Sequence, residues 1–148
     1  MNARSLTASC LLLLCSVVLS TSFGCGGTTG PKRVPVSGTV KYEDGSIPTG
    51  AVTAIRFEPA RGGNAADPNT KAASGTIQPD GSYQLTTVEE NDGAFPGEYK
   101  VTFSVMKDYG DNISLVAQEF TNAATTPHSA TVTLDGENKF DFTIKPRK

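Results

Sequence analysis

The chain has 148 residues, with 15 glycines, 9 prolines, no tryptophan and a formal net charge of −2 at pH 7. This length suits one domain, and the slight acidic excess gives no reason to expect nucleic acid as a partner. The many turn-forming residues favour short strands over helices.

The first 24 residues have the three regions of a secretory signal peptide. One positive charge, Arg4, precedes a leucine-rich apolar run over residues 8–19, and mostly small and polar residues follow. This apolar run is too short to cross a membrane stably. Of the three cysteines only Cys25 lies beyond the leader, so no disulfide can form within the mature chain.

Cys25 follows the leader directly and is followed by Gly26, Gly27 and two threonines. This arrangement resembles a bacterial lipoprotein signal, in which the cysteine is acylated and becomes the first residue. Gly24 fits the position before the cysteine, whereas Ser22 stands where the family usually has leucine. The resemblance implies lipidation of Cys25, anchoring in a membrane through its acyl chains, and residence in the outer membrane or at the cell surface. An ordinary secreted protein is the alternative.

Residues 25–33 are rich in glycine and threonine and are interpreted as a flexible tether. Beyond them, apolar and polar residues alternate in short segments separated by turn signals, which is typical of strands. We expect strands over residues 34–42, 51–59, 72–78, 81–87, 97–106, 130–134 and 140–144. Residues 107–126 are less regular, and they predict either one or two helical turns with Asn112 as N-cap or a long crossover loop held by Phe120.

Two turn signals predict how these strands connect. The run Pro79-Asp80-Gly81 predicts a type I turn with a glycine bulge, which would make a hairpin of the third and fourth strands. The pair Asp135-Gly136 predicts a last hairpin between the sixth and seventh strands. Together the pattern predicts an all-β fold, a seven-stranded antiparallel β-sandwich.

Five groups of residues in the domain carry a recognisable pattern. They are Ser37-Gly38-Thr39-Val40, Ile47-Pro48 with Gly50-Ala51-Val52, Gly75-Thr76-Ile77, Pro79-Asp80-Gly81-Ser82-Tyr83-Gln84-Leu85 and Pro96-Gly97-Glu98-Tyr99-Lys100-Val101. Their order resembles a carboxypeptidase regulatory-like domain of the transthyretin-like and Cna B-type group. The whole chain is similar to small lipoproteins of planctomycete-type bacteria. The resemblance implies a transthyretin-like (prealbumin-like), Ig-like sandwich over residues 34–148 that acts as a rigid adhesive or spacer module.

No catalytic arrangement is expected. His128 is the chain's one histidine, and nothing in the sequence pairs it with a nucleophile and an orienting carboxylate, so it is interpreted as an exposed loop residue. Some transthyretin relatives hydrolyse hydroxyisourate with several histidines, an arginine and a Tyr-Arg-Gly-Ser ending. This chain ends in Lys-Pro-Arg-Lys, and that activity is not expected. We predict no enzyme activity and no cofactor.

Glu89, Glu90 and Asp92 form a weak candidate metal site just before Gly93. Carboxylate oxygens are the hard ligands that calcium prefers. The chain has no complete calcium-binding loop, however, and a solvated acidic loop is the preferred interpretation.

Two further features, known from Cna B-type and sugar-binding domains, are not expected here. An isopeptide bond would join Lys41 to Asn138 or Asp141, but the alternation of the strands places Lys41 and Asp141 on the solvent side. The tyrosines could line a sugar-binding face, but three of the four fall on predicted core faces and only Tyr109 is expected to be exposed.

The sequence therefore predicts a non-catalytic, lipid-anchored protein of the cell envelope that acts as a structural or protein-interaction module. The expected partners are the membrane, through the acyl chains on Cys25, and an envelope protein or polysaccharide. The alternative is binding of a polysaccharide or small ligand by loops 61–70 and 88–95, because binding residues favour loops on rigid scaffolds. An enzyme is the least favoured interpretation.

Overall fold

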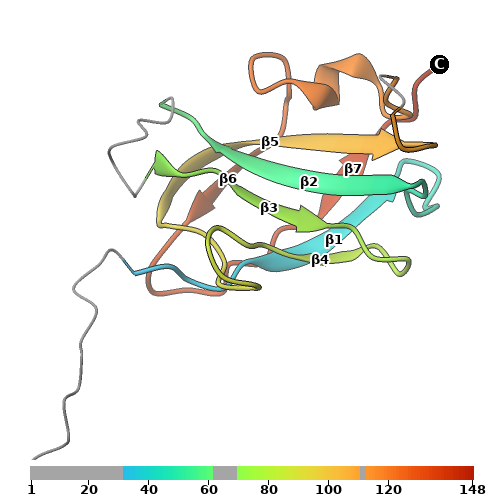
Figure 1. Cartoon of the computed structure of the whole chain (residues 1–148). Coiled ribbons are helices and arrows are strands. Elements are labelled where there is room, and N and C mark those ends of the chain that lie inside the picture. The colour runs from blue at the N-terminus through green and yellow to red at the C-terminus, as the bar shows by residue number, and fades with distance from the viewer. Residues whose placement is uncertain (1–31, 62–69, 111–112) are drawn as a thin grey trace, which may run out of the picture. The chain divides into compact units, whose positions relative to one another are not determined.

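The computed structural model describes residues 32–61, 70–110 and 113–148, which form mostly strands in two sheets (Figure 1). The strands are β1 (Ser37–Tyr42), β2 (Val52–Pro59), β3 (Ala73–Thr76), β4 (Ser82–Gln84), β5 (Gly97–Met106), β6 (Ser129–Val132) and β7 (Phe142–Ile144). The all-β prediction is confirmed, and each strand lies within or close to a predicted segment. The predicted leader and Cys25 lie outside the described residues. In the described ranges no helix is long and apolar enough to cross a membrane.

The strand order is β4-β1-β7 in one sheet and β3-β2-β5-β6 in the other. The second sheet is antiparallel throughout, and its longest pairing joins β2 to β5 from Val52↔Met106 to Pro59↔Tyr99. In the first sheet β1 runs antiparallel to β4 but parallel to β7. The expectation of a wholly antiparallel arrangement is therefore wrong for this pair. The first and last strands meet only after the chain has folded, so no turn between them sets their direction.

The two predicted hairpins are wrong in their pairing. The turn before β4 does form, because the Gly81 amide donates a 2.8 Å hydrogen bond to the Gln78 carbonyl and Gly81 has a φ of 84°. However, β3 and β4 belong to different sheets and are bridged only at Ser74 and Thr86. Strands β6 and β7 are separated in the same way. A period of two tells which side chains face the core, but not which strand lies alongside.

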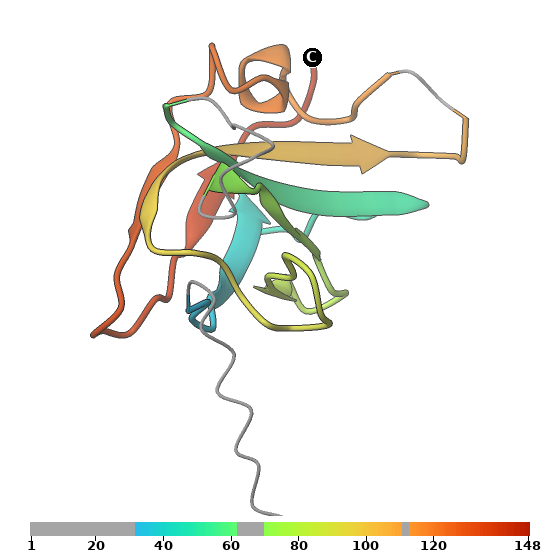
Figure 2. The ribbon, with the colours of Figure 1, turned by 60° about the vertical axis from the view of Figure 1, so that its left-hand side comes forward.

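Side chains of both sheets pack into one core. The ring of Phe57 on β2 lies at its centre, with its centroid 6.4 Å from Tyr83 on β4, 5.9 Å from Tyr99 on β5 and 6.1 Å from Phe142 on β7. The ring planes are tilted or edge-on, which is the arrangement that aromatic pairs prefer. Figure 2 shows the two layers, with β2 and β5 in one and β1 in the other.

The segment after β5 ends in the short 3-10 helix η2 (Gln118–Thr121), which has no side-chain cap. Phe120 of η2 is buried, and its ring lies 6.5 Å from that of Phe103, so the predicted anchoring role of Phe120 is confirmed. Asn112, the predicted N-cap, lies outside the described residues. The amide of Ala117 donates to the Lys145 carbonyl at 2.9 Å, which ties this segment to the C-terminal tail. Both figures place η2 and the C-terminus away from the blue start of the described chain.

Candidate functional site

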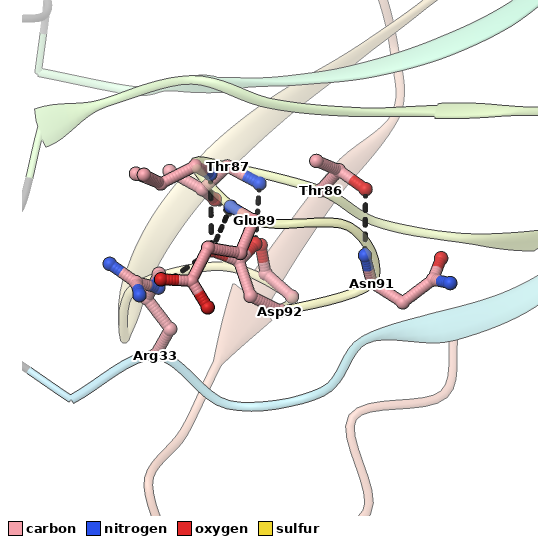
Figure 3. Close-up of polar contacts among 8 residues, drawn as sticks. Arg33, Thr86, Thr87, Glu89, Asn91 and Asp92 are labelled. Atoms are coloured by element: carbon pink, nitrogen blue, oxygen red, sulfur yellow. Dashed lines mark hydrogen bonds and ion pairs between the residues drawn. The ribbon is translucent and has the colours of Figure 1, made fainter.

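The acidic loop after β4 is folded around the carboxylate of Asp92 (Figure 3). Its Oδ1 accepts a 2.7 Å hydrogen bond from the Thr87 amide. Its Oδ2 accepts hydrogen bonds from the amides of Val88 and Glu89, at 3.1 and 2.8 Å. Oδ2 also lies 2.8 Å from Nε of Arg33. The carboxylate of Asp92 therefore holds the loop together.

These contacts determine the charge state of Asp92. Burial alone would raise the pKa of the carboxyl group, but the amides of Glu89, Thr87 and Val88 and the charge of Arg33 outweigh it. As a result the pKa of Asp92 lies below its ordinary value of 3.8. Asp92 is thus ionised at neutral pH, as an ion pair with Arg33 requires.

Arg33, the last residue of the predicted tether, is attached to the domain. Its guanidinium carbon lies 5.7 Å from the centre of the Phe95 ring, in a cation–π arrangement. The next residue, Val34, exchanges two backbone hydrogen bonds of 2.9 and 3.0 Å with Ala94. The chain therefore enters the domain through a clamp, made by Arg33 and Val34 on one side and Asp92, Ala94 and Phe95 on the other.

The structure does not bring Glu89, Glu90 and Asp92 together as a metal site. Asp92 is occupied by three amides and Arg33, whereas Glu89 and Glu90 are exposed. Across the described ranges, no group of three or more histidine, cysteine, aspartate or glutamate side chains is placed to hold a metal ion.

His128 is not the exposed loop residue that the sequence predicts. Its half-buried ring stacks on Phe120 at 5.4 Å and meets Phe103 and Phe142 at 5.7 and 5.2 Å. Its Nε2 lies 3.0 Å from the carbonyl oxygen of Thr143. These neighbours are rings and a backbone group, none of which is a nucleophile, so His128 packs between β5 and β7. The two-residue repeat of β6 could have indicated this, because His128 falls on the same face as the buried residues of that strand.

Of the three residues that an isopeptide bond would involve, Asn138 and Asp141 have other hydrogen-bond partners. Lys41 and Asp141 are exposed, as predicted, and Asp141 accepts hydrogen bonds from the Thr39 amide and hydroxyl at 2.9 and 2.8 Å. Asn138 is buried, and its side-chain amide exchanges two 2.9 Å hydrogen bonds with the backbone of Thr133. The Asn138 side chain thereby forms, at the end of β6, the pair of hydrogen bonds that a neighbouring strand would form with the backbone.

The tyrosines lie as the sequence predicts. Tyr83 and Tyr99 are buried, and their hydroxyl groups each donate a 2.8 Å hydrogen bond, to the carbonyls of Phe140 and Phe95 respectively. Burial raises the pKa of both hydroxyl groups. Tyr109 is 84% exposed. The buried rings leave no tyrosine-lined sugar face in the described sheets.

A polar groove of about 910 Å³ lies between the edge strands β3 and β4, which are neighbours in Figure 1. Its most accessible lining groups are hydroxyl and amide side chains, those of Thr39, Ser74, Thr76, Gln78, Gln84 and Asn91. Two charged residues, Glu90 and Lys139, also line it. Of the loops predicted to bind a ligand, 88–95 contributes Glu90 and Asn91 to the groove, while residues 62–69 lie outside the described ranges.

The floor of the groove is made by close backbone contact between the two edges. Ser74 and Thr86 exchange hydrogen bonds of 2.9 and 2.8 Å, and a Cβ atom on Gly75 would lie 2.3 Å from the Gln84 carbonyl oxygen. The sequence shows outward-facing polar residues on each strand, but not that edges of two different sheets lie side by side. Comparisons with family models, curated proteins and solved structures found no match for this chain.

Proposed function

We propose that this chain is a non-catalytic, lipid-anchored protein of the cell envelope, and that its transthyretin-like β-sandwich is a structural or protein-interaction module. The leader and Cys25 support the anchoring part of the proposal. The observation that carries the module part is the clamp at the domain entrance. An anchored module must keep its fold when its tether is pulled, and the Arg33–Asp92 ion pair and the Val34–Ala94 pairing hold the chain where the tether begins.

The arrangement of β1 and β7 supports a load-bearing role as well. These strands are parallel neighbours near the start and the end of the domain. Pulling the two ends of the domain apart therefore loads the pair in shear, so that its hydrogen bonds must break together rather than one after another. A spacer or adhesive module needs this resistance.

The two side chains whose chemistry could most readily serve catalysis support the non-catalytic part of the proposal. The carboxylate of Asp92 is held by three amides and an arginine, and the imidazole of His128 packs among rings. A general base needs access to the proton that it removes, and the carboxylate of Asp92, held by these donors, does not offer it.

Metabolic labelling with palmitate tests the anchor. We expect the label on the wild-type chain and none on Cys25→Ala, which should leave the membrane fraction. Cys10→Ala and Cys15→Ala are matched controls, because both residues precede the cleavage point and should leave labelling unchanged. Label that persists in Cys25→Ala would contradict lipidation at this residue.

Separation of inner and outer membranes tests the proposed location. We expect the labelled chain in the outer-membrane fraction or accessible to protease on intact cells. Recovery of unlabelled chain from the medium would favour the secreted alternative instead.

A second candidate function is binding of a polysaccharide or small ligand. The polar groove between β3 and β4 favours it, because it gathers hydroxyl and amide groups on a rigid sheet surface. This candidate does not depend on the anchor.

A further inference from the structure

We infer that the groove between β3 and β4 binds a neutral, polyhydroxylated chain, that is, an uncharged oligosaccharide. This inference deepens the second candidate function. It commits to a site on the sheet surface rather than on loop 61–70, and to a chemical class of ligand.

The hydrogen-bonding groups of the groove divide into two sets. Some are occupied within the protein, since the Ser82 hydroxyl donates to Asp80 at 2.6 Å and the Thr39 hydroxyl donates to Asp141. The side chains of Thr76, Gln78 and Gln84 form a second set, which is exposed and makes no hydrogen bond to another group in the described ranges. These unoccupied groups come from β3, the turn and β4, so they surround the groove.

The chemistry of the second set matches sugar hydroxyl groups. An amide side chain offers donors and an acceptor together, and a hydroxyl can do both. A sugar hydroxyl also donates and accepts, so each contact can be satisfied without burying a charge.

The charges of the groove argue against an anionic ligand. Glu90 and Lys139 have opposite signs, and both lie toward the same end, because Lys139 is bridged to Ser37 and Glu90 is in the loop after β4. Their fields therefore oppose each other, while the remainder of the lining is uncharged. The carboxylates of Asp80 and Asp141 also contact hydroxyl groups of the groove, so an anionic chain gains nothing from this arrangement.

The floor of the groove argues against an extended peptide. A peptide that joins a sheet needs a free edge whose backbone groups can pair with it. Here the backbone of Ser74 is already paired with Thr86, and Gly75 lies against the Gln84 carbonyl, so the two edges close on each other. A ligand must be recognised by side chains above this floor.

The groove offers no open aromatic ring. Tyr83 lines it, but its ring is only 1% exposed and its hydroxyl is bonded to Phe140. Recognition then depends on hydrogen bonds and on contacts with aliphatic groups of the lining, and stacking on an aromatic ring does not contribute. We therefore expect weak binding whose affinity increases when several sugar units lie along the groove.

The test uses the full chain, solubilised in detergent, on an array of neutral and acidic oligosaccharides and on a peptide array. We expect retention of neutral oligosaccharides. In Gln84→Ala their apparent affinity should fall about fivefold, which is the size expected when one hydrogen bond is lost. Gln118→Ala is the matched control, because Gln118 is an exposed glutamine on η2 and does not line the groove.

Thermal unfolding followed by circular dichroism checks that both variants keep the wild-type fold, which is expected because Gln84 is exposed. The inference is overturned if no neutral oligosaccharide is retained, if only acidic oligosaccharides or peptides are retained, or if Gln84→Ala and Gln118→Ala behave alike. Anchoring is read by palmitate labelling, so its failure and the failure of this site are separate results.

Discussion

Nε of Arg33 lies 2.8 Å from Oδ2 of Asp92, and this ion pair joins the first residues of the domain to the loop that follows β4 (Figure 3). Asp92 also accepts three backbone amides of its own loop. One side chain therefore stabilises both the loop and the domain entrance, and the Asp92 side chain, only 11% exposed, is shielded from solvent. Its removal should affect stability more than the loss of an exposed ion pair would.

Replacement of Asp92 by asparagine is predicted to lower the free energy of unfolding by about 2 kcal/mol. The NH₂ group of asparagine cannot accept a hydrogen bond, so at least one of the N–H donors around the side chain would lose its acceptor. Urea unfolding followed by tyrosine fluorescence measures this, since the chain has no tryptophan. Glu89→Gln is the control, because Glu89 is exposed and should change stability little. Equal effects of the two substitutions would show that the Asp92 carboxylate has no special role.

The same carboxylate predicts a pH dependence. The pKa of Asp92 is lowered in the folded state, so its contribution to stability is present above the ordinary carboxyl value of 3.8 and is lost as the pH falls below it. The difference in unfolding free energy between wild type and Asp92→Asn should therefore be largest near neutral pH and shrink in acid. A difference that stays constant down to strongly acidic pH would contradict the lowered pKa.

Tyr83→Phe should have its clearest effect in alkali. Burial, with a smaller contribution from Asp141, raises the pKa of Tyr83 above its ordinary value of 10.0. A raised pKa contributes stability below pH 10, and this contribution is lost as the pH rises above that value. The variant should lose about 1 kcal/mol at neutral pH with its hydrogen bond to Phe140, and it should then show a shallower alkaline decline than wild type. Parallel alkaline profiles would contradict this.

Gly75→Ala tests the close contact between β3 and β4. The added Cβ would lie 2.3 Å from the Gln84 carbonyl oxygen, so the backbone of one strand must move. We expect a loss of about 2–3 kcal/mol, which is the upper part of the range seen for overpacked sites. Ser74→Ala is the matched neighbour, because its exposed side chain makes no such contact, and it should remain near wild type in the same urea titration. A stable Gly75→Ala variant would mean that the two edges can separate easily.

His128→Ala is predicted to destabilise the protein by about 2 kcal/mol, because it removes ring contacts with three phenylalanines and the hydrogen bond to Thr143. Ser129→Ala, at an exposed position next to it, should have little effect. Melting temperatures of the two variants provide the comparison. A wild-type melting temperature for His128→Ala would place the ring outside the core.

Much of the fold could be predicted from local rules. Alternation along each strand identified the core faces, and Asp80-Gly81 identified the turn in which Gly81 takes a φ of 84°. Phe120 was expected to hold the crossover segment, and Tyr109 to be exposed, and both are so. The core faces and the turn depend on neighbours within a few residues, so the sequence by itself determined them, whereas Phe120 packs against the distant Phe103.

Only the tertiary structure decided which segments meet. The parallel β1–β7 pair, the packing of His128 among rings and the Arg33–Asp92 clamp all join residues far apart in the chain, and β3 and β4, although consecutive, fall in two different sheets. A pattern with a period of two orients a side chain but does not name its partner. The polar groove exists for the same reason, because it forms where the edges of two sheets lie side by side, and no single strand encodes that neighbourhood.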